Sequence, residues 1–477
     1  MLGCCEAIVT ASAGRLGNTL GGESMGRRLI VCLAVVSAMV AVWPLRVAQA
    51  AGFQVTESSI SGAGYGFAGL VAGGEDASAL FFNPAGIAYL NDAQVLLGLH
   101  SIRPTVTFTD AGSTTLANTA LTGEAGRSDA TGVAPNFYYV RPVGAQGRFG
   151  LGVSAPFGLT TDYGEDWVGR YHATKSQLQT ININPVFSYR ASDKVALGIG
   201  LNAQYAKISL ANRVDSFSAC ANVAGQLGQD VATACGDLTG PSIAANDGDV
   251  ELDGQAWSFG FNAGIVFSVN DKTRVGFSFR QGMRHRFDGG SADFNISAAC
   301  AVNPLCVAAT VDSPIRANMA LPDIAILGFR HQVADRLTLL GDVTWHGWDT
   351  LDAVIVEFED GSGRDNRLEF GWANTLRYGL GLVYDYGHPW TFRAGVAFDE
   401  SPSQTVALNT PRVPDGDRAT LSLGVGYVID ENFTLDAAYT RLFVDDMAIA
   451  NVQQGHTLNG RIELSAQVFS IQARYRF

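Results

Sequence analysis

The chain has 477 residues, of which 47% are hydrophobic and only 16% are charged, and its net charge is −13. An average soluble protein is about 25% charged, and the abundance of Leu, Val, Ile and Phe excludes an intrinsically disordered chain. No apolar run of about 18 residues follows residue 50, which excludes a helical membrane protein. The low charge, the 55 glycines and the many aromatic residues favour an outer-membrane β-barrel.

Residues 1–50 have the features of an export signal that follows a short upstream extension. Met25 opens a basic segment, 29–42 form an apolar stretch too short to span a bilayer, and Ala48-Gln49-Ala50 is a small-residue cleavage site. We therefore expect translation to start at Met25 and cleavage to follow Ala50. Without this leader the chain keeps 28 basic and 43 acidic residues, a net charge of −15 that disfavours nucleic acid or anionic lipid as partners.

Residues 51–92 are predicted to form an N-terminal hatch of short helices and turns inside the barrel. The segment is rich in small residues and lacks the alternation of a strand. Asp76 is a candidate N-cap of a short helix that Asn83-Pro84 would end. Large apolar side chains such as Tyr65 and Phe81 demand burial, which argues against a disordered periplasmic tail.

Residues 93–477 are predicted to form the barrel, because fourteen segments alternate apolar and polar side chains as membrane-barrel strands do. These segments begin near Ala93, Gly132, Gly147, Ser176, Lys194, Gln255, Thr273, Leu321, Arg336, Asn366, Pro389, Asp417, Asn432 and Glu463. In the last segment the aromatic residues from Phe469 to Phe477 share the face opposite Arg474 and Arg476. Arginines in lipid would be costly, so the aromatic face is outside. A soluble β-sandwich, the alternative, would not place aromatics outward so regularly.

The predicted fold is therefore all-β: a 14-stranded antiparallel transmembrane β-barrel plugged by the hatch. Such a barrel is too wide for its own side chains to fill, so the hatch has room inside it. The terminal aromatic Phe477 is the mark that bacterial outer-membrane proteins present to the barrel-assembly machinery. We expect a monomer in the outer membrane of a Gram-negative bacterium, surrounded by membrane lipid and lipopolysaccharide.

Two long segments, 212–254 and 288–320, are expected to be extracellular loops because they are rich in Gly, Ala and Asp. They carry the four cysteines left after the leader, in two close pairs: Cys220 with Cys235, and Cys300 with Cys306. Two disulfides are favoured in an oxidising compartment. A metal site is the alternative, but no histidine lies close in sequence to either pair. We expect no metal, no cofactor and no catalytic residue.

Several distinctive stretches follow one another along the mature chain. They are Ala51-Gly52-Phe53-Gln54, Ser59–Gly64, Asn83-Pro84-Ala85, Pro156–Leu159 leading to Trp167–Tyr171, and Phe398–Pro402 leading to Pro414–Arg418. In these stretches the sequence resembles the FadL-type outer-membrane transporters of long-chain fatty acids and other hydrophobic compounds. The resemblance implies a route: substrate is collected among the extracellular loops, enters a pocket near the hatch N-terminus and leaves sideways through the barrel wall.

The resemblance also implies roles for particular residues. Phe53, at the hatch N-terminus, is expected to point into the pocket and to gate the ligand. The run Asn83-Pro84-Ala85 is expected to hold the hatch fold and to line the exit. The third strand contains Gly150, Gly152 and Pro156, and a kinked strand that breaks its ladder would open the wall there. The alternative is that Gly150 and Gly152 do not open the wall and only make room for the hatch.

A fatty acid presents a carboxylate, and burying that group needs a cation or several hydrogen-bond donors. Arg170, Arg377 and Arg393 are the candidates, although pairing with acids of the lumen is the alternative for each. The resulting hypothesis is a non-enzymatic, passive and ligand-gated uptake of long-chain fatty acids with lateral release. An uptake channel for aromatic or alkane hydrocarbons is the alternative. A general diffusion porin, the third possibility, requires a loose or absent hatch.

Overall fold

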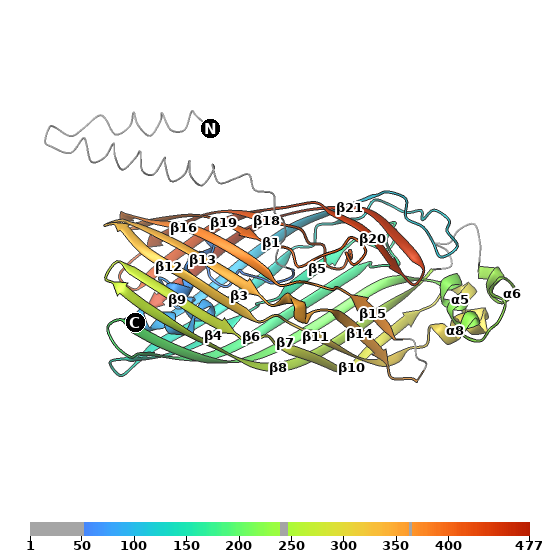
Figure 1. Ribbon diagram of the computed structural model, residues 1–477, viewed down its shortest axis with the longest axis horizontal. Helices are drawn as coiled ribbons and strands as arrows, with labels where there is room; N and C mark the ends of the chain where they lie inside the picture. Colours follow the sequence, from blue (N-terminus) through green and yellow to red (C-terminus); the bar gives the residue numbers. More distant parts are fainter. Residues whose placement is uncertain (1–51, 239–246, 362–364) are drawn as a thin grey trace, which may run out of the picture. The chain divides into compact units, whose positions relative to one another are not determined.

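The computed structural model describes residues 52–238, 247–361 and 365–477, so the expected leader, its start at Met25 and its cleavage site lie outside the described residues. Fourteen strands form a closed antiparallel barrel, which confirms the predicted fold (Figure 1). Their segments are β1 (Gln94–Asp110), β3 (Gly132–Val143), β4 (Gly147–Ser154) continued by β5 (Gly158–Asp162), β6 (Lys175–Arg190), β7 (Val195–Asp215), β8 (Asp247–Asn270), β9 (Thr273–Arg280) continued by β10 (Arg284–Asn295), β11 (Ser313–Ala320) leading to β12 (Ile324–Ala334), β13 (Leu337–His346) continued by β14 (Ala353–Phe358), β15 (Asn366–Glu369) leading to β16 (Thr375–Gly387), β17 (Trp390–Asp399), β18 (Arg418–Val428), β19 (Phe433–Val444) and β21 (His456–Arg476). Two short strands, β2 (Arg127–Ser128) and β20 (Met447–Gln453), add to one end of the barrel by pairing with β1 and β21.

The barrel closes where its last strand pairs with its first. All 17 residues of β1 have partners in β21, from Gln94 opposite Arg476 to Asp110 opposite Gly460. Some strands begin earlier than predicted, notably β8 at Asp247 and β21 at His456. Their early residues extend beyond the apolar band, where no lipid imposes an apolar face and the alternation fades.

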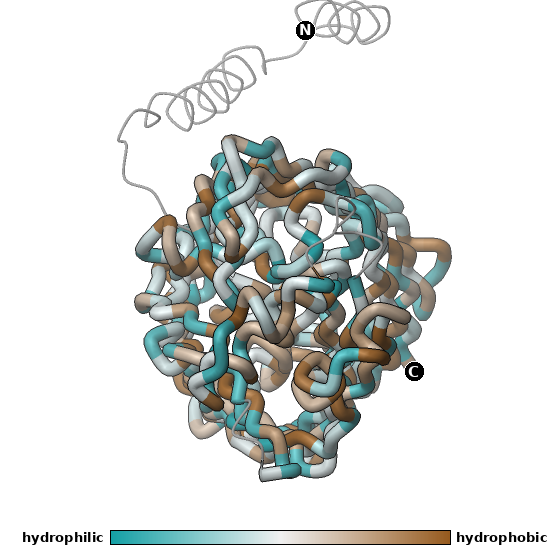
Figure 2. Tube along the Cα trace, turned by 90° about the vertical axis from the view of Figure 1, so that its right-hand side faces the viewer, coloured by the Kyte–Doolittle hydropathy of each residue, from teal (hydrophilic) through white to brown (hydrophobic). Residues whose placement is uncertain are grey.

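The two faces of the wall differ as a membrane barrel requires. Large apolar side chains such as Leu201 and Phe259 are 64% and 74% exposed on the outside. Polar side chains such as Asn202 and Gln472 are buried toward the lumen. Viewed from the end that carries the loop helices, chain segments cross the interior of the ring (Figure 2). No helix among the described residues is both long and apolar enough to cross a bilayer.

The hatch fills the part of the barrel that lies toward the C-terminus (Figure 1). It contains α3 (Ile60–Ala63), η1 (Leu70–Ala72), α4 (Ala79–Phe82) and η2 (Pro84–Tyr89). The prediction that Asp76 caps the short helix is wrong, because α4 begins only at Ala79 and has Ser78 at its N-cap. Asp76 Oδ1 instead accepts a hydrogen bond from Ser78 N at 3.0 Å and stabilises the turn before the helix.

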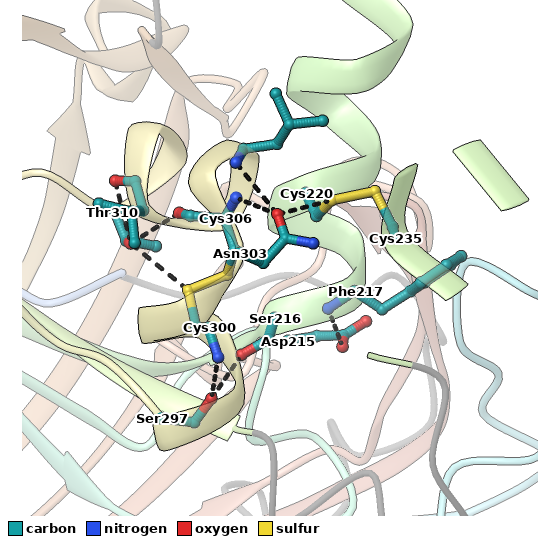
Figure 3. Close-up of a disulfide and its surroundings, with 12 residues drawn as sticks. Asp215, Ser216, Phe217, Cys220, Cys235, Ser297, Cys300, Asn303, Cys306 and Thr310 are labelled. Carbon is teal, nitrogen blue, oxygen red and sulfur yellow. Dashed lines mark hydrogen bonds between the residues drawn. A yellow bond between two sulfur atoms is a disulfide. The ribbon is translucent and has the colours of Figure 1, made fainter. Parts of the chain in front are cut away.

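The two cysteine-bearing loops form a helical cap beyond the strand ends (Figure 1). The helices of this cap are α5 (Ser216–Gln226), α6 (Val231–Cys235), α7 (Ala298–Val302) and α8 (Pro304–Ala309). Cys220 is bonded to Cys235 and Cys300 to Cys306, the same pairs as in the sequence prediction (Figure 3). Asn303 joins the two loops by donating from Nδ2 to Ala234 O at 3.0 Å. Long loops of this kind lie on the extracellular side of such barrels.

Candidate functional site: a cavity between the hatch and the wall

A cavity of about 520 Å³ lies between the hatch N-terminus and the barrel wall. Its volume falls within the range of about 300–1,000 Å³ that is typical of sites for small molecules. Apolar side chains from the hatch and from β1, β19 and β21 make up much of its lining. Its charged lining residues include Glu57, Lys207, Arg377, Asp399 and Arg418.

Phe53 lies at the apolar end of this cavity, in a cluster of aromatic rings. Its own ring centroid is 6.2 Å from that of Phe157, 5.1 Å from that of Trp348 and 5.6 Å from that of Trp372. The side chain is only 6% exposed. No sequence pattern predicted the two tryptophans, because Trp348 lies in the connection between β13 and β14, Trp372 lies in the connection between β15 and β16, and neither follows a strand alternation. Phe53 thus lies at the pocket, in the position that the resemblance implied.

The wall is interrupted beside Phe53, between β4 and β5. The ladder with β6 runs to Ser154 opposite Asn182 and resumes at Gly158 opposite Gln179. Three residues of the third strand, 155–157, therefore lie opposite only two residues of β6, 180 and 181. Thr180 Oγ1 takes the place of the missing ladder partner by accepting from Phe157 N at 2.9 Å. The glycines and Pro156 of the third strand predicted a break in this strand. In the structure the kink follows Ser154.

The hatch N-terminus lies directly along this break. Gln54 forms an antiparallel bridge with Phe157, in which Val55 N donates to Pro156 O at 2.9 Å and Gly158 N donates to Phe53 O at 3.1 Å. These backbone hydrogen bonds satisfy strand groups that the kink leaves without a ladder partner. The N-terminal segment therefore acts as a short extra strand at the gap.

The cavity extends from this gap to the lipid-facing side of the wall. Val133 and Ile181, which are 62% and 50% exposed on the outer face, belong to the same lining as the buried Phe53. One continuous space thus joins the aromatic cluster in the lumen to the outside of the barrel.

Two arginines line the polar end of the cavity, and both are paired. Arg377 Nη1 is 3.2 Å from Asp342 Oδ1, and its Nε is 3.6 Å from Asp399. Arg418 Nη2 is 2.8 Å from Asp415 Oδ1 and also donates to Gly52 O. Sequence reasoning named Arg377 but not Arg418, although Arg418 ends one of the stretches that carry the resemblance.

Asp415 holds the start of the hatch together with Arg418. Its Oδ2 accepts from Gly52 N at 3.1 Å and from Ser401 Oγ at 3.1 Å. Burial raises the pKa of the Asp415 carboxyl, and the nearby Arg418 opposes that rise. The backbone of Gly52 is therefore clamped between a carboxylate and a guanidinium.

Arg170 lies outside the cavity lining, in the loop between β5 and β6. Its Nε is 2.9 Å from Asp247, and its Nη2 donates to Tyr171 Oη at 3.1 Å. Burial lowers the pKa of Arg170, but Tyr171 and Asp247 more than compensate and leave it above its ordinary value. The paired guanidinium braces the loops, which is the alternative weighed for this residue.

Arg393 is also away from the cavity lining and fastens the hatch to the wall. Its Nη2 is 2.7 Å from Glu75 of the hatch, and its Nη1 is 2.8 Å from Asp436 of β19. Gln472 of β21 extends the network by donating to Asp436 at 2.8 Å and to Asp76 at 3.0 Å. This buried network links the hatch to three strands.

The run Asn83-Pro84-Ala85 holds the hatch against a different stretch of wall. Asn83 Nδ2 donates to Val71 O at 2.7 Å, and its Oδ1 accepts from Ala85 N at 2.9 Å. The run lies on Gly198 of β7 and Gly264 of β8, where a Cβ would overlap the hatch atoms. It supports the hatch fold, as expected, but lies away from the gap between β4 and β5.

The two glycines of the third strand also make room for the hatch. A Cβ on Gly150 would lie 3.0 Å from Ile87 Cδ1, and one on Gly152 would lie 2.7 Å from Leu80 Cδ1. Of the residues expected at the exit, Pro156 is the one that the structure places at the gap. Within the described ranges, no three His, Cys, Asp or Glu side chains are grouped so as to hold a metal ion.

Comparison with known sequences gives one family. Residues 41–477 match the family model described as outer membrane protein transport protein (OMPP1/FadL/TodX). Outer membrane protein P1 of Haemophilus influenzae is 29% identical over 413 residues, which cover 83% of this chain and 86% of that protein. The long-chain fatty acid transport protein of Escherichia coli is 28% identical over 403 residues, which cover 82% of this chain and 87% of that protein.

Solved structures of the same architecture are also similar. A Pseudomonas aeruginosa FadL homologue superimposes with a TM-score of 0.80 at 25% identity, covering 90% of this chain and 100% of the homologue. The toluene transporter TodX of Pseudomonas putida superimposes with a TM-score of 0.65 at 20% identity, covering 88% of this chain and 98% of TodX. At that lower identity the likeness to TodX concerns the fold alone.

Proposed function

Because the chain belongs to the OMPP1/FadL/TodX family of outer membrane transport proteins, we propose that it takes up long-chain fatty acids and releases them sideways through its barrel wall. The family and the fold are those of transport channels rather than enzymes, and their place is the outer membrane of a Gram-negative bacterium. The transport of hydrophobic compounds is common to the family. The choice of fatty acids and the lateral route are the proposal.

The observation that carries the proposal is the continuous cavity. It begins at the ring of Phe53, passes the interruption between β4 and β5, and reaches the exposed side chains of Val133 and Ile181. An acyl chain that follows this path stays among apolar side chains and enters the membrane without crossing water. That transfer is favourable for apolar surface and needs no energy source.

Phe53 is the proposed gate of this path. An acyl chain that enters the aromatic cluster competes with the Phe53 ring for Phe157, Trp348 and Trp372. Displacing that ring pulls on Gln54 and breaks its bridge to Phe157. The gap between β4 and β5 then loses the extra strand that lies along it, and the ligand opens its own exit.

Arg377 and Arg418 are the proposed contacts for the fatty acid's carboxylate. Both line the cavity, whereas Arg170 and Arg393 do not. A bound carboxylate would have to share these guanidiniums with Asp399 and Asp415. The same pairing favours the second candidate, a neutral hydrocarbon, because such a ligand leaves both ion pairs intact.

Deletion of Ala155 tests the lateral route. Removing one of residues 155–157, which lie opposite only two residues of β6, restores a continuous ladder between the third strand and β6. A strain that lacks the chromosomal gene, complemented with this variant, should take up labelled oleate no faster than the empty-vector strain. The substitution Ala155→Ser keeps the chain length and should leave uptake unchanged. Parental uptake by a correctly folded deletion variant would contradict lateral release.

Two further measurements separate the candidates. Growth of the deletion strain on oleate, compared with growth on toluene or on an alkane, identifies the class of substrate that depends on this protein. Planar bilayers that contain the purified protein should show no steady ion conductance, because the hatch is fastened inside the barrel. A persistent porin-like current would favour the diffusion pore instead.

A further inference from the structure

On the outer face of β21 the side chains change from apolar to polar at Gln467, whereas the exposed Phe443 of the neighbouring β19 lies one row further out. On β21 the outward aromatic residues end at Phe469, and the next outward residue is Gln467. The register places Gln467 opposite Arg103 of β1 on one side and opposite Arg441 of β19 on the other. Two arginines therefore flank one glutamine in the row directly beyond Phe469.

This row lies at the extracellular boundary of the membrane. Arg103 is nine residues from Gln94, the end of β1 that pairs with the last strand residue Arg476. At about 3.4 Å per residue and a tilt of about 40°, it stands roughly 23 Å above that end. The apolar band of such barrels is about 25 Å tall, so the row is level with the lipid head groups.

Neither arginine has a carboxylate partner among the residues that the structure describes. The Arg103 guanidinium lies 5.4 Å from the centre of the Phe469 ring, and that of Arg441 lies 5.5 Å from the Phe443 ring. Five other exposed arginines beyond the apolar band are paired with acids: Arg127 with Asp129, Arg286 with Asp288, Arg316 with Glu357, Arg367 with Glu369, and Arg461 with Asp446. Arg284 of β10 is exposed and has no ion pair among the described residues. In a chain of net charge −13, this row is left without its own counter-ion.

We propose that Arg103 and Arg441 bind a phosphate group of lipid A, the phosphorylated glycolipid of the outer leaflet. Their backbones are two strand spacings apart, about 10 Å, and long guanidinium side chains on such backbones reach one phosphate from both sides. Arginine pairs with phosphate through two parallel hydrogen bonds. Basic clusters next to the apolar band of a membrane protein recognise anionic head groups in this way.

Gln467 completes the site between the two arginines. Its Oε1 accepts a hydrogen bond from Tyr439 Oη at 3.2 Å, which leaves its amide nitrogen to donate. Glu463 is the next outward acid on β21, four residues and roughly 13 Å further from the membrane. Because the ring of Phe469 lies directly below the row, an anion held there has its other side among acyl chains, as a lipid does.

The site adjoins the mouth of the cavity. Ile102, the residue before Arg103, is the last residue of β1 that pairs with β3, and it lines the cavity together with Pro104. A glycolipid held by Arg103 thus stands beside the gap through which substrate is proposed to leave. Binding of the glycolipid does not depend on that route, so failure of one proposal leaves the other standing.

Titration of the full-length protein in detergent with diphosphoryl lipid A, followed by native mass spectrometry, tests the site. The double variant Arg103→Gln/Arg441→Gln should bind at least about tenfold more weakly, since each charged hydrogen bond contributes well over a factor of five. The variant Arg284→Gln/Arg286→Gln removes the same charge from exposed positions of β10 and should stay within about twofold of the parent. Circular dichroism and heat-resistant migration report whether each variant is folded.

Two ligands establish which chemistry is recognised. Dephosphorylated lipid A should bind the parent protein about as weakly as diphosphoryl lipid A binds the Arg103/Arg441 variant. Inorganic phosphate at the same concentration should not displace the lipid. Full displacement by phosphate would show an anion site rather than a lipid site, and equal losses in both double variants would show general charge attraction. Unchanged affinity in a folded Arg103/Arg441 variant would equally overturn the proposal.

Discussion

The hatch has two parts that are held inside the barrel by different means. Its body, residues 60–89, is fastened by the buried Arg393 network and lies with its backbone directly on glycines of the wall. Its N-terminal segment, residues 52–57, is held by the bridge at Gln54, by ring contacts and by the clamp on Gly52. The body is held by a buried ion-pair network and close packing, while the segment is held by one backbone bridge, by ring contacts and, at Gly52 only, by the charged clamp.

This difference predicts that the hatch body stays in place while the N-terminal segment moves. Breaking a buried ion pair leaves an uncompensated charge and costs about 3–5 kcal/mol, so the body stays in place. Breaking the backbone hydrogen bonds of the bridge at Gln54 costs about 0.5–1.5 kcal/mol each, so this bridge opens locally while the clamp on Gly52 and the rest of the hatch remain folded. A barrel can therefore admit a lipid through its wall without emptying its lumen.

Removing the lock should have the largest effect. Arg393→Ala leaves Glu75 and Asp436 buried without their shared cation, and we expect a loss of about 3–5 kcal/mol in the free energy of unfolding. Urea titration in lipid vesicles measures it. The exposed Arg367→Ala removes pairs with Asp352 and Glu369, which solvent screens, and should lower the free energy of unfolding far less. Similar costs for the two variants would mean that the network does not lock the body.

Adding a methyl group under the body should have the next largest effect. In Gly264→Ala the new Cβ overlaps the side chain of Asn83, and we expect a destabilisation of about 1–3 kcal/mol from forced repacking. The same urea titration reports it. Gly225→Ala, in α5 with open space around the glycine, should stabilise slightly through helix propensity. An unchanged stability of Gly264→Ala would show that the body moves aside easily.

Phe53→Ala should loosen the segment and leave the body unaffected. We expect faster hydrogen exchange at the Val55 and Gly158 amides, which form the bridge, while the Gly69 amide keeps its hydrogen bond to Asp342 and its protection. Oleate affinity should fall about tenfold because a ring contact and its buried area are lost. Faster exchange at Gly69 as well would mean that the two parts of the hatch move together.

The smallest effect is expected at the polar end of the cavity. Arg377→Lys keeps the charge beside Asp342 and Asp399 but loses the planar donors. We expect oleate to bind about two- to fivefold more weakly, and oleyl alcohol to bind as before, in a fluorescence displacement assay. Arg170→Lys, in the loops, should alter neither ligand. If Arg377→Lys weakened the binding of oleate and of oleyl alcohol equally, the arginine would have a structural role, and a neutral substrate would be favoured.

The strands were predictable because lipid outside and polar groups inside impose a period of two on every crossing. That constraint ends with the apolar band, which is why the outer residues of β8, from Asp247 onward, escaped the pattern. The roles of the arginines were not predictable in the same way. Arg393 and Arg418 both lie at inward positions. Only the placement of the hatch puts Arg393 beside the hatch body and Arg418 beside Gly52. Trp348 and Trp372 meet Phe53 through connections that carry no periodic signal.

The glycine contacts between hatch and wall also bear on how the molecule is assembled. The hatch backbone at Tyr65 and Gly66 lies on Gly395 of β17, a surface that is synthesised long after the hatch itself. Once β21 has paired with every residue of β1, a ring of hydrogen bonds surrounds the lumen. A hatch that is in position while the sheet is still open avoids entry through the end of a closed ring. Closure of the seam around it brings Gly395 against the hatch backbone at the same time as it completes the β1–β21 pairing.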